Sequence, residues 1–90
     1  MPTVKFTYAL GRFFSGLQDT HAASGTINDV LKEIDARYPG IRNYILDDQG
    51  SLRRHVNIFI DGVMINDRRS LTDRFSEKSE IYIMQALSGG

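Results

Sequence analysis

The sequence predicts an α+β fold, in which a mixed sheet of four to five strands carries one main helix on one face. The first observation is that a single segment, residues 26–38, has apolar side chains at a clear helical period. The second is that segments on both sides of it have the alternating or β-branched pattern of strands. The third is length, because 90 residues suffice for one core but not for two. One helix cannot cover both faces of a sheet, so the economical packing places it on one side.

The segment before the helix is expected to form two strands. Residues 4–10 alternate between large apolar side chains and small or polar ones, as in a half-buried strand, and Gly11 ends them. Residues 12–16 form a loop whose two phenylalanines are expected to tuck under the sheet edge. A second, weaker strand is expected over residues 17–23, joined to the first by a loop longer than two residues.

The helix is the best-defined element of the sequence. Thr26 can cap its first free amides, and Asp29, three residues later, completes a pattern like a capping box. Glu33 and Arg37 stand four residues apart on the polar face, where they can pair. Pro39 ends the helix, because proline disfavours helical geometry in the residue before it. The apolar stripe consists of Ile27, Val30, Leu31, Ile34 and Tyr38.

After the helix, short turns alternate with strands. The expected segments are, in order, a helical turn at residues 41–45, a surface turn at 47–50, a strand at 55–60, a tight hairpin turn at Asp61-Gly62, a returning strand at 63–65, a charged loop at 66–70, an apolar turn holding Leu71 and Phe75, and a final strand at 80–85. The final strand is the most apolar, which favours a central position beside the first strand. Because an intervening connection separates these two strands, their pairing can be parallel.

Alternation along the two long strands predicts a surface that could bind a partner. Successive side chains of a strand point to opposite faces. If the core takes Val56, Ile58, Ile60, Ile81 and Ile83, three large apolar side chains, Phe59, Tyr82 and Met84, point away from the helix. Exposed aromatic and methionine side chains are typical interface anchors, so these three are expected to form a partner-docking patch. The alternative is that they pack on loops or are ordinary surface residues.

Composition and charge exclude several classes of protein. The formal net charge is zero, so no overall field draws the chain to nucleic acid or an anionic membrane. No apolar run approaches the roughly 20 residues of a membrane span, and the polar start does not resemble a signal peptide. The absence of cysteine removes thiol nucleophiles, disulfides and the sulfur ligands of structural zinc. We therefore expect a cytoplasmic protein without nucleic-acid or membrane partners.

The sequence indicates no catalytic side chains and no metal site. His21 and His55 lack metal-ligand spacing and a partnering cysteine, so ordinary strand or surface roles explain them better. The carboxylates of Asp47, Asp48 and Asp61 could be paired for acid–base work, but turn chemistry explains them better. No glycine-rich phosphate loop follows a strand, so the chain is not expected to bind ATP.

Two arginine pairs and a fifth arginine form the basic clusters of the sequence. They could contact RNA, but they lack both interleaved aromatic residues and a net positive charge. We interpret them as solvated side chains or as groups that steer acidic partners. They are Arg53-Arg54, Arg68-Arg69 and Arg74.

The element order and several motifs resemble ubiquitin-like proteins of the β-grasp fold, and in particular the small sulfur carriers of the MoaD/ThiS family. The motifs are the helix start Thr26-Ile27-Asn28-Asp29-Val30-Leu31, the strand Val56-Asn57-Ile58-Phe59-Ile60, the run Gly62-Val63-Met64-Ile65-Asn66-Asp67, the segments Ser70-Leu71-Thr72-Asp73 and Glu80-Ile81-Tyr82-Ile83, and the terminal Gly89-Gly90. The longer middle, residues 38–55, looks most like the CysO-type carriers that serve cysteine synthesis. The tail has Ser88 where carriers often have alanine, and it lacks the arginines that flank the diglycine of ubiquitin.

The resemblance implies a β-grasp domain over residues 1–86 and a flexible diglycine tail over residues 87–90. It implies that a ubiquitin-activating-type adenylyltransferase uses ATP to adenylate the carboxylate of Gly90, and that a sulfur donor then converts it to a thiocarboxylate. A sulfur-accepting synthase would be the second partner. Leu87, Ser88 and Gly89 would thread into the active site of the partner, where glycine suits a narrow channel. The chain itself would bind no cofactor and carry no catalytic residue.

Other interpretations use the same terminus differently. Gly90 could form an isopeptide bond to lysine, which would make the chain a protein modifier. The domain could also be a non-covalent β-grasp binding module with an inert tail, and the two glycines could be a cloning remnant or a frayed end. The sequence does not distinguish cysteine, molybdopterin and thiamine synthesis as the destination of the sulfur.

Overall fold

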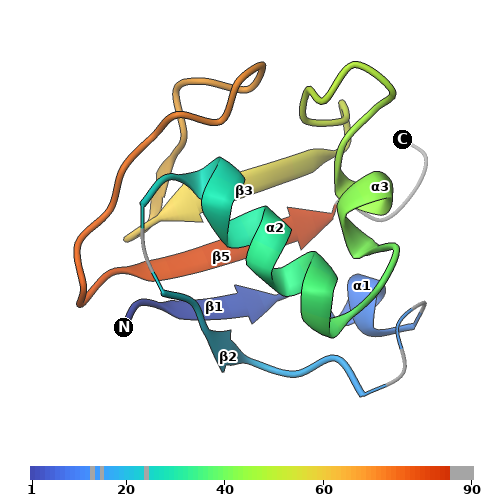
Figure 1. The fold of residues 1–90 in the computed structure, drawn as a ribbon, viewed down its shortest axis with the longest axis horizontal. Helices are drawn as coiled ribbons and strands as arrows, with labels where there is room; N and C mark the ends of the chain where they lie inside the picture. Colours follow the sequence, from blue (N-terminus) through green and yellow to red (C-terminus); the bar gives the residue numbers. More distant parts are fainter. Residues whose placement is uncertain (13, 15, 24, 86–90) are drawn as a thin grey trace.

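The computed structural model describes residues 1–12, 14, 16–23 and 25–85. Its strands are β1 (Thr3–Phe6), β2 (Thr20–His21), β3 (Val56–Ile60), β4 (Val63–Met64) and β5 (Glu80–Gln85), and its helices are α1 (Tyr8–Gly11), α2 (Ile27–Arg37) and α3 (Ile41–Ile45). The strands form one sheet in the order β2-β1-β5-β3-β4, and α2 crosses one face of it (Figure 1). This arrangement confirms the predicted mixed sheet with one main helix on one face.

The central position of β5 is also confirmed. It pairs in parallel with β1, from Thr3 opposite Glu80 to Phe6 opposite Ile83, and antiparallel with β3 on its other side. The Asp61-Gly62 turn joins β3 to β4 as predicted, and both residues have positive φ angles, 51° and 84°. Two positive φ angles are the signature of the tight turn whose twist matches a hairpin.

The core lies between the sheet and the helices. The predicted apolar stripe of α2 is buried from Ile27 to Ile34, and Tyr38 packs against it in part. The inward side chains of the two long strands are fully buried at Val56, Ile58, Ile81 and Ile83, whereas Ile60 is half-buried. Burying these branched side chains is the main stabilisation of a small single-core domain.

The start of α2 has the predicted capping box. The Thr26 hydroxyl accepts a hydrogen bond from the Asp29 amide at 3.3 Å, and the Asp29 carboxylate accepts one from the Thr26 amide at 3.1 Å. The bonds from the Thr26 backbone and side chain hold the pKa of Asp29 below its usual range. The Glu33–Arg37 ion pair is present at 2.8 Å. Arg37 also donates to the Thr20 hydroxyl at 2.7 Å, so it links α2 to the short strand β2, which replaces the longer strand predicted over 17–23.

The prediction of a strand through residue 10 is wrong. Strand β1 ends at Phe6, and residues 8–11 form the helical turn α1. The Thr7 amide donates to the Ile83 carbonyl at 3.1 Å, and the Leu10 amide then turns back to the Thr7 carbonyl at 3.1 Å. Leu10 is fully buried in this conformation. The alternation of apolar residues in the sequence continues past the end of β1, so it predicted a strand that is too long.

The predicted apolar turn at Leu71 and Phe75 is also wrong. The segment is not helical, and Leu71 has a φ of 57°. The Leu71 carbonyl accepts from the Asn28 amide at 3.0 Å, and the Asp73 carbonyl accepts from the Ile27 amide at 3.1 Å. These carbonyls satisfy free amides at the start of α2, and the positive φ of Leu71 interrupts a right-handed helical turn at this place.

Two smaller predictions concern the segments around the main helix. The helical turn at 41–45 and the surface turn at 47–50 are both present. Of the two phenylalanines expected under the sheet edge, Phe14 is half-buried and packs edge-on against Tyr44 of α3, with ring centroids 5.7 Å apart. Phe13 lies outside the described residues.

Candidate functional site

The sheet face opposite α2 carries the three residues predicted as a docking patch. Phe59 pairs directly with Tyr82 across β3 and β5, and Asn57 pairs with Met84. Because side chains alternate between faces, Phe59, Tyr82 and Met84 all lie on the face opposite the buried isoleucines. Tyr82 is 36% exposed, and the other two are half-buried. The structure therefore brings the three predicted residues together on one open face.

Met64 belongs to the same face, and the sequence interpretation missed it. It pairs with Phe59 across β3 and β4, and its side chain is 47% exposed. The signal was available, because a two-residue turn at Asp61-Gly62 places Val63 opposite Ile60 and therefore Met64 opposite Phe59. Hereafter the open-face patch means Phe59, Met64, Tyr82 and Met84.

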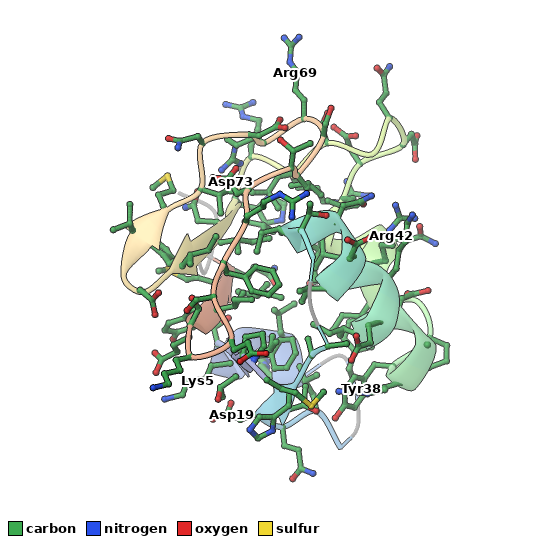
Figure 2. All side chains as sticks on the ribbon, turned by 60° about the vertical axis from the view of Figure 1, so that its left-hand side comes forward. Lys5, Asp19, Tyr38, Arg42, Arg69 and Asp73 are labelled. Carbon is green, nitrogen blue, oxygen red and sulfur yellow. The ribbon has the colours of Figure 1, made fainter. Side chains whose placement is uncertain are left out.

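Polar groups border the open-face patch. Lys5 is the register partner of Tyr82 on the β1 side and forms an ion pair with Glu80 at 3.2 Å. Figure 2 shows Lys5 on the side of the sheet away from the helices. On the β3 side, Arg68 donates to the Asn57 side-chain oxygen at 2.7 Å. An apolar centre within a polar rim is the usual anatomy of a protein–protein interface.

The interpretation of the basic clusters as solvated or steering groups is wrong for Arg68. Its half-buried guanidinium donates to the carbonyls of Arg53 at 2.7 Å and Val56 at 3.0 Å, besides its bond to Asn57. It therefore anchors the loop over residues 66–70 to the start of β3. Arg69, in contrast, points outward from the tip of this loop (Figure 2).

The same loop is held internally by one carboxylate. Asp67 accepts hydrogen bonds from the amides of Arg69, Ser70 and Thr72 and from the Thr72 hydroxyl, at 2.5–3.2 Å. The Ser70 amide and then the Thr72 hydroxyl are the largest causes of a pKa of about 2 for Asp67. Asp73 accepts in turn from the amides of Asn66 and Asp67. These two carboxylates therefore shape the loop through hydrogen bonds to its backbone.

Two of the other carboxylates considered for catalysis, Asp47 and Asp61, accept backbone hydrogen bonds, and that of Asp47 closes the predicted surface turn. Asp47 accepts from the amides of Gln49 and Ser51 at 2.8 and 3.0 Å, and Asp61 accepts from the Glu80 amide at 2.9 Å. Both predicted surface histidines, His21 and His55, are exposed.

The described residues contain neither a cluster of metal-binding side chains nor a candidate membrane-spanning helix. Within residues 1–12, 14, 16–23 and 25–85, no three or more metal-binding side chains gather at one place. In the same residues, no helix has the length and apolar character that crossing a membrane requires.

The predicted site of covalent chemistry lies beyond the last described residue. Strand β5 ends at Gln85, and Leu87, Ser88, Gly89 and Gly90 lie outside the described residues, as does the proposed domain boundary at residue 86. The structure does show where this segment begins. Gln85 pairs with Val56, the first residue of β3, so the tail follows the end of β5 that lies farthest from the Asp61-Gly62 turn.

Comparison with known proteins relates this fold to small carrier proteins. The chain is 26% identical over 90 residues to the sulfur carrier protein CysO of Mycobacterium tuberculosis, covering 98% of this chain and 97% of the relative. The crystal structure of M. tuberculosis CysO superposes with a TM-score of 0.82 at 24% identity, covering 97% of this chain and 100% of that chain. A chain of the Amycolatopsis orientalis BexX/CysO complex gives a TM-score of 0.84 at 18% identity, with complete coverage of both chains. Small archaeal modifier protein 1 of Methanosarcina acetivorans gives 0.77 at 26% identity, covering 98% and 94% of the two chains.

These structural similarities establish the ubiquitin-like β-grasp fold. Family membership rests on a sequence match that begins after α1 and includes the terminal diglycine. A model of the ThiS family matches residues 12–90, which is most of the chain. The protein therefore belongs to the ThiS family.

Proposed function

We propose that this protein is a sulfur carrier that acts through its C-terminal carboxylate. A partner enzyme transfers the adenylyl group of ATP to the carboxylate of Gly90 and releases pyrophosphate. Sulfide then attacks the carbonyl carbon and displaces AMP. Alternatively, the terminal sulfur of a persulfide makes this attack, and a thiol then reduces the resulting acyl disulfide. The product is a thiocarboxylate at Gly90, which a second enzyme uses as a sulfur nucleophile in biosynthesis.

One observation carries this proposal. The family match extends through residue 90, so the diglycine belongs to the matched sequence instead of following it. Relatives named sulfur carrier proteins cover almost the same length of chain. This argues against a cloning remnant and against an inert tail.

The arrangement of the sheet suits a protein that presents its terminus to another enzyme. The last strand is the central one, held by β1 and β3 on its two sides, so the segment after Gln85 starts from a fixed place. A carboxylate is a poor electrophile until it carries a good leaving group, and the adenylate supplies one. The electrostatic stabilisation of that step comes from the partner. In this proposal the chain supplies the reacting carbonyl and a docking surface, and ATP and the sulfur donor are bound by partners.

The open-face patch is the proposed docking surface for an adenylyltransferase of the ubiquitin-activating type. Phe59 and Tyr82 are directly paired, and Met64 and Met84 extend the apolar area on either side. The structural similarity to a chain from the BexX/CysO complex supports binding of proteins with this fold to a second protein. A sulfur-accepting synthase is the proposed second partner. We place these reactions in the cytoplasm, where ATP is available.

Intact mass measurement tests the covalent chemistry. The full chain is incubated with a candidate activating enzyme, ATP and a sulfide source, and a gain of about 16 Da is expected as sulfur replaces one oxygen. A variant lacking Gly90 should keep its fold and thermal stability and gain no mass. An unchanged mass of the wild-type chain with every activating enzyme tested would count against the proposal, and unfolding of the deletion variant would show that the tail is structural.

Protein modification is the second candidate function. The observation that favours it is the similarity to small archaeal modifier protein 1, at a TM-score of 0.77. The same adenylate, attacked by a lysine amine, would give an isopeptide bond instead of a thiocarboxylate. The mass experiment separates the two, because conjugation gives a much heavier lysine-linked product.

A further inference from the structure

The end of β5 is held by side chains where the backbone ladder on one side has stopped. Strand β1 ends at Phe6, and the Thr7 amide makes the last backbone bond on that side, to the Ile83 carbonyl. The Gln85 amide then has no strand carbonyl of β1 beside it, and it donates to the Thr7 hydroxyl at 3.2 Å. A side chain thus replaces a missing ladder acceptor at the last residue of β5.

A second side-chain contact holds Gln85 on the helix side of the sheet. Its side-chain nitrogen donates to the Tyr44 hydroxyl of α3 at 3.1 Å. The Tyr44 ring is itself positioned by the edge-on contact with Phe14. We refer to Thr7, Tyr44 and Gln85 as the Gln85 latch. Its members come from three separate parts of the chain and meet at the residue from which the tail starts.

Stability alone does not explain a side-chain amide at position 85. Its side-chain oxygen is buried and accepts no hydrogen bond from the residues that the structure describes. An unsatisfied buried acceptor is costly, whereas replacing both partners of a buried hydrogen bond with apolar groups of the same shape is close to neutral. A methionine at position 85 facing a phenylalanine at position 44 would fill similar space without that cost. A role other than stability therefore explains the pair better.

We propose that Gln85 is a positioning residue for activation of the terminus, held in place by Thr7 and Tyr44. The inference rests on the proposed function. In this proposal, five residues, 86–90, follow Gln85 in the sequence, and they carry the carboxylate into the active site of the activating partner. With the latch broken, the end of β5 can fray, and the partner must order at least one more residue before the carboxylate is in place.

The size of the effect follows from backbone entropy. Ordering the backbone of one additional residue costs enough to change an equilibrium by about 5- to 30-fold. We therefore expect kcat/KM for adenylation of the carrier to fall by about 5- to 30-fold when the latch is lost. The open-face patch is on the opposite side of the sheet from the Gln85 side chain, so docking itself should be unaffected.

Four variants separate positioning from simple stabilisation. Tyr44→Phe removes the hydroxyl that accepts from the side-chain nitrogen of Gln85. Both stability and kcat/KM should therefore fall. Tyr44→Phe/Gln85→Met removes both groups of the Tyr44–Gln85 hydrogen bond, so its stability should exceed that of Tyr44→Phe while kcat/KM stays low. Thr7→Val removes the second acceptor of the latch, and Thr7→Ser should restore it. The readouts are chemical denaturation, adenylation kinetics with the full chain, and exchange of the Gln85 amide hydrogen.

Tyr38→Phe is the matched control. It removes the Tyr38 hydroxyl, which donates to the Gly16 carbonyl at 3.4 Å, and Tyr38 lies at the end of α2 outside the latch. We expect it to change neither kcat/KM nor exchange at Gln85. In the latch variants, exchange should rise at Gln85 and remain slow at Ile58 and Ile83 in the middle of the sheet.

The outcomes for the latch and for the proposed function are distinguishable. Recovery of kcat/KM together with stability in the double variant would overturn the latch and leave the sulfur-carrier proposal intact. So would faster exchange at Gln85 without any change in kcat/KM. A wild-type chain that no activating enzyme adenylates would overturn both proposals.

Discussion

At the scale of single residues, Gly25 shows how one backbone position makes a helix start possible. It has a φ of 106°, and a Cβ built on it would lie 2.3 Å from the Asp29 carboxylate oxygen that completes the capping box. Glycine adopts this dihedral angle readily, whereas an added Cβ would strain the backbone and push the Asp29 carboxylate out of its capping position. We predict that Gly25→Ala destabilises the protein by about 1–3 kcal/mol, through backbone strain and loss of the cap. Urea denaturation measures this as a lower midpoint at an unchanged slope.

Gly50→Ala is the matched control for this prediction. Gly50 also has a positive φ, 83°, but no atom lies within 4 Å of a Cβ built there. The alanine therefore carries the cost of the dihedral angle without the collision. If both variants lose the same stability, the capping box contributes nothing beyond the backbone effect.

Asp67 gives the protein a predictable acid response. Its pKa is lowered from 3.8 to about 2 in the folded chain, first by the Ser70 amide. A carboxyl whose folded pKa is depressed stabilises the fold above its unfolded pKa, and this contribution is lost as the pH falls through the folded value. We predict that the wild type loses stability as the pH falls from about 4 to about 2. The Asp67→Asn variant should be less stable at neutral pH and should lose less stability over the same pH range.

Denaturation midpoints measured across this pH range check the effect of Asp67. The control is Asp48→Asn, since the Asp48 carboxylate accepts none of the hydrogen bonds found among the described residues. Parallel pH profiles for wild type and Asp67→Asn would show that the loop bonds do not couple to folding.

At the scale of elements, the sequence predicted those whose signal is local. Helix α2 carries its stripe, its cap and its stop within one segment, and the predicted and observed elements agree to within a residue. The end of β1 could not be read in this way, because it depends on how far the neighbouring β5 is paired and on the turn that buries Leu10. The segment at Leu71 was misread because its carbonyls are used by the start of α2, about 40 residues earlier in the chain.

Strand β5 has a buried face and an exposed face, and substitutions on the two faces should have different effects. Ile83 is fully buried, whereas Tyr82 is 36% exposed on the open face. We predict that Ile83→Ala lowers the free energy of unfolding by about 2–5 kcal/mol, because it leaves a cavity in the core. Tyr82→Ala should cost less than about 1 kcal/mol in stability, as for most exposed positions, yet weaken binding of the activating partner. Equal losses of stability in the two variants would mean that the faces are not divided in this way.

At the scale of the whole molecule, the two faces of the sheet carry different side chains, and its two ends lead to different segments. The helix face holds the core, the open face offers Phe59, Met64, Tyr82 and Met84, and the Gln85 end of β5 leads to the terminus. Alternation along single strands was enough to predict three patch residues. The latch was beyond such reasoning, because positions 7, 44 and 85 meet only through the sheet register and the placement of α3.

Docking through one whole face makes a prediction that neighbouring residues can test. Met64 pairs with Phe59 on the open face. Val63, the preceding residue of the same strand, pairs with Ile60 and points to the opposite face. Both are exposed, at 47% and 69%. We predict that Met64→Lys weakens binding of the activating partner by about tenfold or more, as expected for a charge placed in the apolar centre of an interface.

Val63→Lys is the control for Met64→Lys, because it adds the same charge at the next residue but off the proposed docking face. Titration calorimetry with the activating partner gives the two dissociation constants, and thermal unfolding shows that both variants remain folded. Long-range electrostatics should be nearly equal for the two lysines, so a difference in affinity reports contact with the open face. Equal weakening by both substitutions would assign the effect to charge alone, and weakening by Val63→Lys only would place the partner on the opposite face of the hairpin.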